Sequence, residues 1–348
     1  LGGADFSILA PNVKGLTSAA VIGRRIIKSM QEPFVAEGTE VYLTPSIGIA
    51  GYPDDARDAG TLLKLAVAAS SQTDSGERLK FYSAEMNQVS LARLRLEADL
   101  RRAVENNEFR LLYQPKVELS TGRIIGAEAL IRWEREGGEI VSPMDFIPVA
   151  EETGLILEIG ERVLGEACRQ LARWREEGID LRVSVNISAL QFFEGDLLAQ
   201  VTSALAEAGL EPESLILEVT ESILMDRVDQ AVDTLFQLRK LGLGISIDDF
   251  GTGYSSLSYL KRFDVDEVKI DRSFVIDVGR SREDRALITA VTYLSHKLGA
   301  RVCAEGVEDA AQLKFLNTVK CDEYQGYFCS RPVSPGALVD LVRTVNRK

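Results

Sequence analysis

The chain has 348 residues, of which 45% are hydrophobic and 27% are charged. This composition is typical of a globular protein with one large domain or two moderate ones. The formal net charge of −13 argues against binding to nucleic acid polymers, which requires a basic surface. A small anionic ligand stays compatible with this charge if metal ions or local basic side chains offset it.

Cysteine and histidine usage narrows the possible chemistry. The single histidine, His296, argues against a His-based triad and against a His-rich metal site. The cysteines show no CxxC pair and no metal-finger spacing, so we expect free thiols in a reducing cytoplasm. No apolar run approaches the length of a membrane span, and no signal peptide is visible. Because the chain starts inside an apparent strand, we expect a fragment whose upstream sensor or membrane-attached regions are missing.

The first part of the chain predicts the back half of an α/β domain. Its apolar periodicity indicates a strand at 6–10, a helix at 18–30, a strand pair within 41–50, a helix at 59–70 and a strand at 79–82. Residues 90–106 then predict an amphipathic helix that leads into a second domain. We therefore divide the chain into 1–84, a linker helix at 85–106 and a second domain at 107–348.

The second domain alternates short β-rich runs with helical segments. The predicted strands are 109–114, 124–132, 183–187, 215–219, 244–247, 267–270, 301–304 and 322–325. The predicted helices are 155–177, 196–208, 228–241, 285–298, 310–319 and 335–345. Eight strands separated by helices predict an α/β fold of the (β/α)8 TIM-barrel type. The connection at 116–123 is too short for a crossover helix, so the first two strands should be antiparallel.

One predicted strand ends in two adjacent carboxylates, Asp248 and Asp249, followed by Gly251 and Gly253. Neighbouring strand residues face opposite sides, so both acids point to one site only if the backbone bends there. A surface turn is the commoner interpretation of such a pair when it stands alone. The other strands decide between the two interpretations.

Each predicted strand carries a polar residue at or near its end. Because barrel active sites lie at the carboxyl ends of the strands, we expect these side chains to converge. Five carboxylates in one place need a counter-charge, and oxygen ligands favour Mg²⁺ or Mn²⁺. An aspartate shared by two such ions is the layout of two-metal phosphoryl chemistry. In strand order the residues are Gln114, Glu128, Asn186, Glu218, Asp248 with Asp249, Lys269, Glu305 and Gln325.

Each of these residues also has a structural interpretation, but their recurrence at strand ends favours a shared site. A Schiff-base role for the lysine of strand six is a weaker alternative, because the nearby acids would keep that lysine protonated. The structural alternatives are ion pairs of Glu128 and Glu218 with Arg132 or Lys269, a helix cap at Asn186, an ion pair of Lys269 with Asp271, and a helix-start acid at Glu305.

Ordered motifs over about residues 90–348 resemble the EAL-domain phosphodiesterases. The resemblance implies a barrel with an antiparallel first strand that hydrolyses cyclic di-GMP to linear pGpG with two Mg²⁺ or Mn²⁺ ions and is inhibited by Ca²⁺. It also implies a homodimer formed through this domain. The motifs include Glu128-Ala129-Leu130, Asn186-Ile187-Ser188, Glu218-Val219-Thr220-Glu221, Asp248-Asp249-Phe250-Gly251, Lys269-Ile270-Asp271 and Glu305-Gly306-Val307-Glu308.

The resemblance implies a role for each matching position. One metal would be held by Glu128, Asn186, Glu218 and Asp248, and the second by Asp248, Asp249 and Glu305. Lys269 would orient the attacking water, Glu305 is the candidate general base, and Glu221 would fix the loop after Asp249. Arg132 would bind the phosphate, and Gln325 would complete the catalytic set. The nucleotide would be lined by Gln114, Leu130, Asp145, Pro148, Glu308 and Tyr327.

The N-terminal part resembles the latter half of the GGDEF diguanylate cyclases. Ala4 removes an acid that such cyclases use for metal, Asp5 is shorter than the usual Glu, and residues 66–74 depart from the usual pattern of the family. The resemblance therefore implies that the fold is kept while synthesis is lost. A regulatory role that includes GTP binding stays open.

Overall fold

The structure is a computed structural model that describes residues 6–11, 13, 15–30, 34–36, 39–41, 43–73, 78–82, 84–252 and 261–347. The chain divides into two compact units, Leu1–Ala98 and Asp99–Lys348, and each is described by itself.

The described residues of the first unit form two small sheets, the helices α1 (Gly15–Ser29) and α2 (Ala59–Ser70), and the first part of α3 (Ala84–Glu105). Strands β1 (Phe34–Ala36) and β2 (Thr39–Val41) pair antiparallel, and β3 (Ile47–Ile49) pairs parallel with β4 (Leu79–Phe81). Helix α2 begins where the Asp58 side chain accepts a hydrogen bond from the Thr61 amide. It packs closely on β3, because a Cβ on Gly48 would lie 1.9 Å from the Ala66 carbonyl oxygen.

The helices of this unit follow the sequence prediction more closely than the strands do. Residues 6–10 form no strand, and the predicted pair within 41–50 is wrong because its two halves join different partners. Phe6 and Leu9 are exposed, and no described strand pairs with their segment. Apolar alternation does not make a strand without a neighbouring backbone to complete its hydrogen bonds.

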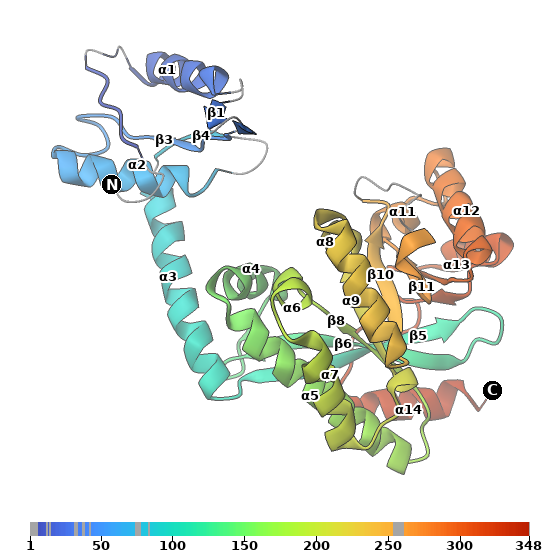
Figure 1. The fold of residues 1–348 in the computed structure, drawn as a ribbon. Helices are drawn as coiled ribbons and strands as arrows, with labels where there is room; N and C mark the ends of the chain where they lie inside the picture. Colours follow the sequence, from blue (N-terminus) through green and yellow to red (C-terminus); the bar gives the residue numbers. More distant parts are fainter. Residues whose placement is uncertain are drawn as a thin grey trace. The chain divides into compact units, whose positions relative to one another are not determined.

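The second unit is an eight-stranded closed barrel surrounded by helices (Figure 1). Strand β5 is antiparallel to both of its neighbours, β6 and β13, and this closes the barrel and confirms the predicted antiparallel start. The two-residue β7 (Ile140–Val141) extends β6 outside the barrel. The barrel strands are β5 (Phe109–Glu118), β6 (Ile124–Glu134), β8 (Arg182–Asn186), β9 (Leu215–Thr220), β10 (Gly244–Phe250), β11 (Glu267–Ile270), β12 (Arg301–Ala304) and β13 (Glu323–Tyr324).

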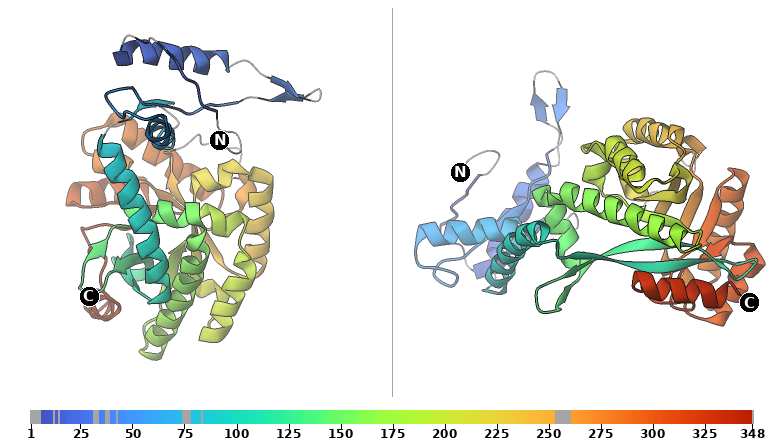
Figure 2. Two further views of the ribbon diagram at one scale, coloured as in Figure 1. Left: turned by 90° about the vertical axis from the view of Figure 1, so that its left-hand side faces the viewer. Right: turned by 90° about the horizontal axis from the view of Figure 1, so that it is seen from below.

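The helices cover the outside of the barrel, and α14 lies along the β5–β6 ribbon (Figure 2). Each predicted helix of this unit is present with ends shifted by at most a few residues, but the short helices α4, α6, α8 and α11 were not predicted. Besides the end of α3, the described helices of this unit are α4 (Pro143–Thr153), α5 (Leu155–Glu176), α6 (Ala189–Phe193), α7 (Leu197–Ala208), α8 (Glu221–Asp226), α9 (Val228–Lys240), α11 (Arg272–Ile276), α12 (Arg282–Lys297), α13 (Ala310–Val319) and α14 (Pro335–Val345).

Apolar side chains between the strands and the helices form the core of the barrel. Leu215, Leu217 and Val219 of β9 are fully buried, as alternate residues on the face toward the helices should be. The Trp174 ring of α5 meets the Tyr113 ring of β5 edge-on at 4.7 Å between centroids. This packing leaves the inward faces of the strands to position the polar side chains. None of the described helices is long and apolar enough to cross a membrane.

Candidate active site

A break in β10 brings its two adjacent aspartates together. The register between β10 and β11 shifts between Ile247 and Phe250, and Asp249 adopts a left-handed conformation with φ of 54°. The Asp249 amide donates a 2.9 Å hydrogen bond to Asp248 Oδ1. One carboxylate oxygen from each aspartate lies within 4.8 Å of the other and of Glu305. The backbone therefore bends at these two residues, which is the condition under which both acids can serve one site.

Glu128 of β6 is buried and is held by neutral amide donors. Asn186 Nδ2 donates to its Oε1 at 2.6 Å, and Gln325 Nε2 donates to its Oε2 at 2.6 Å. Gln325 Nε2 also contacts Gln114 Oε1 at 3.0 Å. Burial raises the pKa of Glu128, and Lys269 only partly opposes this effect. These neutral donors fix the Glu128 carboxylate without neutralising its charge, so the carboxylate can still bind a cation.

Glu218 of β9 is buried between two lysines. Its Oε1 accepts a 2.8 Å hydrogen bond from Lys116 Nζ, and its Oε2 accepts one of 2.6 Å from Lys269 Nζ. Burial alone would raise the pKa of Glu218, but the two ammonium groups outweigh it and lower the pKa to about 2. Glu218 therefore carries its negative charge throughout the physiological pH range.

Lys269 of β11 lies at the centre of the acids and is fully buried. Besides Glu218, its Nζ contacts Glu305 at 2.7 Å, Asp248 at 3.1 Å and Glu128 at 3.5 Å. Burial alone would lower the pKa of Lys269, but these carboxylates raise it well above the ordinary lysine value. Lys269 is thus a hydrogen-bond donor with a fixed charge, which agrees with the expectation against a Schiff base.

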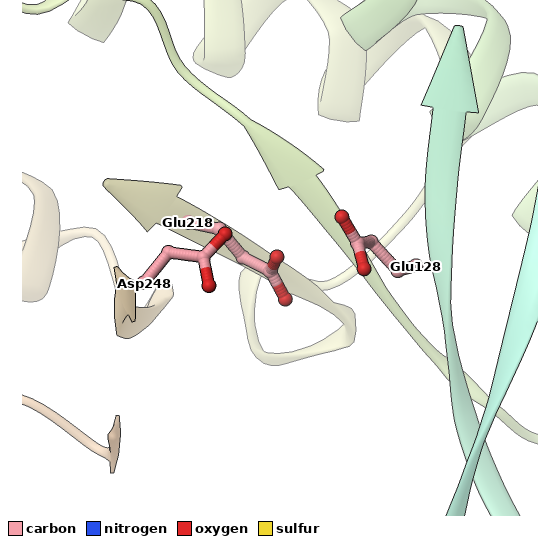
Figure 3. A group of neighbouring side chains, drawn as sticks. All are labelled: Glu128, Glu218 and Asp248. Carbon is pink, nitrogen blue, oxygen red and sulfur yellow. The ribbon is translucent and has the colours of Figure 1, made fainter. Parts of the chain in front are cut away.

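The acid cluster, defined as Glu128, Glu218, Asp248, Asp249 and Glu305, offers oxygen ligands for divalent cations. Glu128, Glu218 and Asp248 form one group of carboxylates whose ligand atoms lie within 4.8 Å of one another (Figure 3), and Asp248, Asp249 and Glu305 form another. The two groups share Asp248. Lys269 is shared among four of these acids and Lys116 contacts Glu218, so two positive charges do not balance five carboxylates. The donor set fits hard cations such as Mg²⁺ or Mn²⁺.

The pKa values of the other acids show that burial and neighbouring carboxylates disfavour their charged forms. Burial raises the pKa of Asp248 and of Asp249, and Lys269 only partly counters it. Burial, opposed by Lys269 and reinforced by Asp248 and Glu128, raises the pKa of Glu305 to about 8. A cation among these carboxylates would favour their charged forms.

The positions expected to line a nucleotide come from several elements of the barrel. Leu130 and Arg132 share the face of β6 that carries Glu128, because alternate strand residues point the same way. Arg132 is half-buried, and burial lowers its pKa while the charges of Glu128 and Tyr327 oppose this effect.

The remaining expected lining residues come from loops and from one helix. Asp145 and Pro148 are exposed on α4, which packs against β6. Glu308 forms an ion pair with Arg272, with 3.0 Å between Glu308 Oε1 and Arg272 Nη2. The Tyr327 ring is partly exposed and lies 4.2 Å from the Arg331 guanidinium, a cation–π contact.

Glu221 connects the start of α8 to the segment after Asp249. The carboxylate is buried, and its Oε2 accepts a 2.9 Å hydrogen bond from the Gly251 amide. This contact is the one expected if Glu221 fixes that loop. Gly253, Tyr254 and the two serines that follow lie outside the described residues.

Several structural alternatives are settled by the contacts. Glu128 and Glu218 do pair with Lys269, as one alternative expected, but Lys269 is shared among four acids. The helix after β8 is capped by Ser188 rather than Asn186. Asp271 caps α11 through the Ser273 amide, and Asp309 rather than Glu305 caps α13. Glu305 and Asn186 are therefore free of the capping roles considered for them.

Two positions differ from the sequence prediction. Gln114 does not lie at the carboxyl end of its strand, because β5 continues to Glu118 and runs against its neighbours; Gln114 reaches the cluster by pairing across from Glu128. Lys116 was not predicted as part of the site. The available signal was its spacing of two residues from Gln114, which places both side chains on one face of β5.

Comparison with known proteins identifies the family. Residues 97–332 match the family described as "EAL domain", and residues 1–78 match "Diguanylate cyclase, GGDEF domain". The EAL match covers most of the chain, so the chain belongs to the EAL family.

Related sequences and structures agree with this assignment. The chain is 43% identical over 345 residues to the "Bifunctional diguanylate cyclase/cyclic di-GMP phosphodiesterase MucR" of Pseudomonas aeruginosa, and 36% identical over 334 residues to the "Cyclic di-GMP phosphodiesterase PdeR" of Escherichia coli. These alignments cover 98% and 95% of the chain but about half of each relative.

Two solved structures carry the same barrel. One is described as "PaMucR Phosphodiesterase, c-di-GMP complex"; it is 47% identical, with a TM-score of 0.68, and the match covers 70% of this chain and 99% of that one. The other is the FimX EAL domain from Pseudomonas aeruginosa bound to c-di-GMP; it is 28% identical, with a TM-score of 0.64, and the match covers 68% of this chain and 96% of that one.

Proposed function

We propose that this chain is a metal-dependent phosphodiesterase that hydrolyses cyclic di-GMP (c-di-GMP) to linear pGpG. The observation that carries the proposal is the acid cluster, in which two carboxylate groups share Asp248 at the mouth of an EAL-family barrel. The names of MucR and PdeR, and the c-di-GMP in the PaMucR complex, support the choice of substrate.

Glu128, Asn186, Glu218 and Asp248 would hold one Mg²⁺ or Mn²⁺ ion, and Asp248, Asp249 and Glu305 would hold a second. Such ions lower the pKa of a water molecule and stabilise charge that develops on a phosphate.

The side chains of the chain itself supply the remaining steps of hydrolysis. Lys269, a permanently charged donor, orients the attacking water by hydrogen bonding. Glu305, which lies 2.7 Å from Lys269 Nζ, is the candidate to accept a proton from that water. Arg132 donates to the phosphate as a planar fork, while Gln114, Gln325, Leu130 and Tyr327 border the nucleotide together with Asp145, Pro148 and Glu308. Attack breaks one of the two phosphodiester bonds and leaves a linear dinucleotide.

The direct test of this proposal is to incubate the purified chain with c-di-GMP and Mg²⁺, with and without EDTA, and to follow pGpG by chromatography. We expect pGpG to form with Mg²⁺ and not to form when EDTA or excess Ca²⁺ is added. If c-di-GMP binds but stays intact at high protein concentration, the chain is a receptor and not an enzyme.

For the N-terminal part we propose a regulatory role without synthesis of c-di-GMP, because Ala4 removes an acid that such cyclases use for metal and Asp5 is shorter than the usual Glu. Both positions lie outside the described residues. Incubation with GTP and Mg²⁺ should give no c-di-GMP, and a measurable cyclase rate would contradict the proposal. We also propose that the barrel forms a homodimer, which sedimentation of the purified chain would test.

A further inference from the structure

The barrel interior contains a second buried lysine, Lys116, deeper than the acid cluster. Its side chain is 2% exposed, and its Nζ contacts Glu218 Oε1 at 2.8 Å and Glu267 Oε1 at 2.7 Å. Ser246 Oγ donates to the same oxygen of Glu267 at 2.9 Å. Lys116 therefore connects a proposed metal ligand, Glu218, to an acid that belongs to neither carboxylate group.

The contact divides the two oxygens of Glu218 between two environments. Oε1 is engaged by Lys116, whereas Oε2 contacts Lys269, the lysine shared with Glu128 and the other acids. Glu218 thus presents one oxygen toward the acid cluster and has the other fixed on the opposite side. The hydrogen bond from Lys116 uses an acceptor position of Oε1 and directs metal coordination toward Oε2.

Glu267 keeps this arrangement electrically neutral. A buried ammonium group next to a cation site would weaken cation binding through like-charge repulsion. The carboxylate of Glu267, 2.7 Å from Lys116, offsets that charge. The pair Lys116–Glu267 supplies a directed hydrogen-bond donor to Glu218 without adding net positive charge to the barrel interior.

We propose that Lys116 is a positioning residue that restricts Glu218 to a single ligand oxygen and so makes the acid cluster favour Mg²⁺ or Mn²⁺ over Ca²⁺. The inference rests on the metal site of the proposed function. Ca²⁺ takes six to eight oxygens and commonly uses both oxygens of a carboxylate, whereas Mg²⁺ requires near-octahedral geometry. Outer partners that orient a ligand typically change metal affinity by roughly 10- to 100-fold when they are removed.

The test compares a charge-neutral double variant, Lys116→Met with Glu267→Gln, with the single variant Glu267→Gln as the matched control. The double variant loses the donor but keeps the net charge of the cluster, and the control keeps Lys116 on Glu218. Mn²⁺ affinity is measured from the free-ion electron paramagnetic resonance signal, and Ca²⁺ affinity by competition. Circular dichroism reports whether each variant is folded.

We expect the ratio of Ca²⁺ to Mn²⁺ affinity to rise about tenfold or more in the double variant. In the control both affinities should change together, with the ratio within about twofold of the wild type. An unchanged ratio in a folded double variant means that Lys116 is only a structural ion pair. If that variant also hydrolyses c-di-GMP normally, the proposed function stands and this inference alone fails.

A crystal structure of the wild-type chain with Mn²⁺ keeps the inference testable if the double variant does not fold. Lys116 Nζ should stay on Glu218 Oε1, and the ion should contact Glu218 through Oε2 alone. An ion bound by both oxygens of Glu218, or a wild-type chain that binds no Mn²⁺, overturns the proposal. A chain that binds Mn²⁺ in this way but leaves c-di-GMP intact contradicts only the proposed hydrolysis.

Discussion

The barrel holds two neighbouring clusters of charged side chains, and they differ in charge balance. In the acid cluster, one lysine, Lys269, is shared among carboxylates that outnumber it. The second is the lower cluster, which we define as Lys116, Glu267, Glu323 and Arg301. Here acids and bases pair: Lys116 contacts Glu267 at 2.7 Å, and Arg301 Nε contacts Glu323 at 2.8 Å.

This contrast separates a ligand site from a structural network. Buried charges are tolerated when they are paired, so the lower cluster is complete without any added ion. The acid cluster has five carboxylates around one shared lysine, an excess of negative charge that the described protein atoms do not neutralise. The predictions below test the difference by changing one cluster at a time.

The largest effect should follow Lys269→Met, which removes the shared lysine of the acid cluster. Leaving buried carboxylates without their partner should lower the free energy of unfolding by about 3–5 kcal/mol without metal, and turnover should be lost. Mn²⁺ should restore part of the stability. Urea unfolding with and without Mn²⁺ measures both effects, with the exposed Lys314→Met as control. Wild-type stability of the metal-free variant would contradict this account of Lys269.

Glu128→Gln should reduce turnover at least about a hundredfold, more than the loss of most outer partners of a ligand. The metal-free variant should be more stable than the wild type, because one of the mutually repelling carboxylates is gone. Turnover of c-di-GMP and thermal unfolding in EDTA provide the measurements. Glu134→Gln, at the exposed end of the same strand, is the control. A rate within tenfold of the wild type would show that Glu128 is not a ligand.

A smaller effect is expected for Glu221→Ala, which removes the hydrogen bond from the Gly251 amide. A hydrogen bond to a charged group contributes about 1.5–3 kcal/mol, so a turnover loss of roughly tenfold is reasonable if the segment after Asp249 becomes less well positioned. Mn²⁺ affinity should change less than turnover. Equal losses in the two measurements would instead place Glu221 in the metal site itself.

The smallest effect on metal binding should follow Glu323→Gln in the lower cluster, with Mn²⁺ affinity within about twofold of the wild type. The change should appear in stability. Burial, reinforced by Glu267, raises the pKa of Glu323 from 4.5 to about 7. Because this pKa is raised, wild-type stability should fall as pH rises from 4.5 through 7, and the variant should lack this fall. Denaturant unfolding at several pH values tests it, and a large loss of Mn²⁺ affinity would refute the separation of the clusters.

Most of the barrel could be predicted because strand and helix periodicities alternate along the chain. The polar residues of the site could be located for the same reason, since a strand's carboxyl end marks the mouth of a parallel barrel. The rule failed for Gln114, because β5 is antiparallel and its carboxyl end lies at the other side. Pairing with Glu128, which only the register reveals, brings Gln114 to the site.

The remaining features depend on contacts that no local pattern encodes. The pattern of β10 required a bend at Asp248 and Asp249, but the left-handed conformation of Asp249 and the register shift are set by pairing with β11. The role of Lys116 depends on Glu267, which is 151 residues away in sequence. The strand expected at 6–10 is wrong because its alternation has no described pairing partner.

The most direct test of the central claim is a calorimetric titration of the metal-free wild-type chain with Mn²⁺. Two carboxylate groups that share Asp248 predict two bound ions per chain. The Glu128→Gln variant should lose binding at one of the two sites. The Glu323→Gln variant should keep binding at both. A wild-type chain that binds no Mn²⁺, or that binds it equally well after Glu128→Gln, would contradict the assignment of the acid cluster as a metal centre.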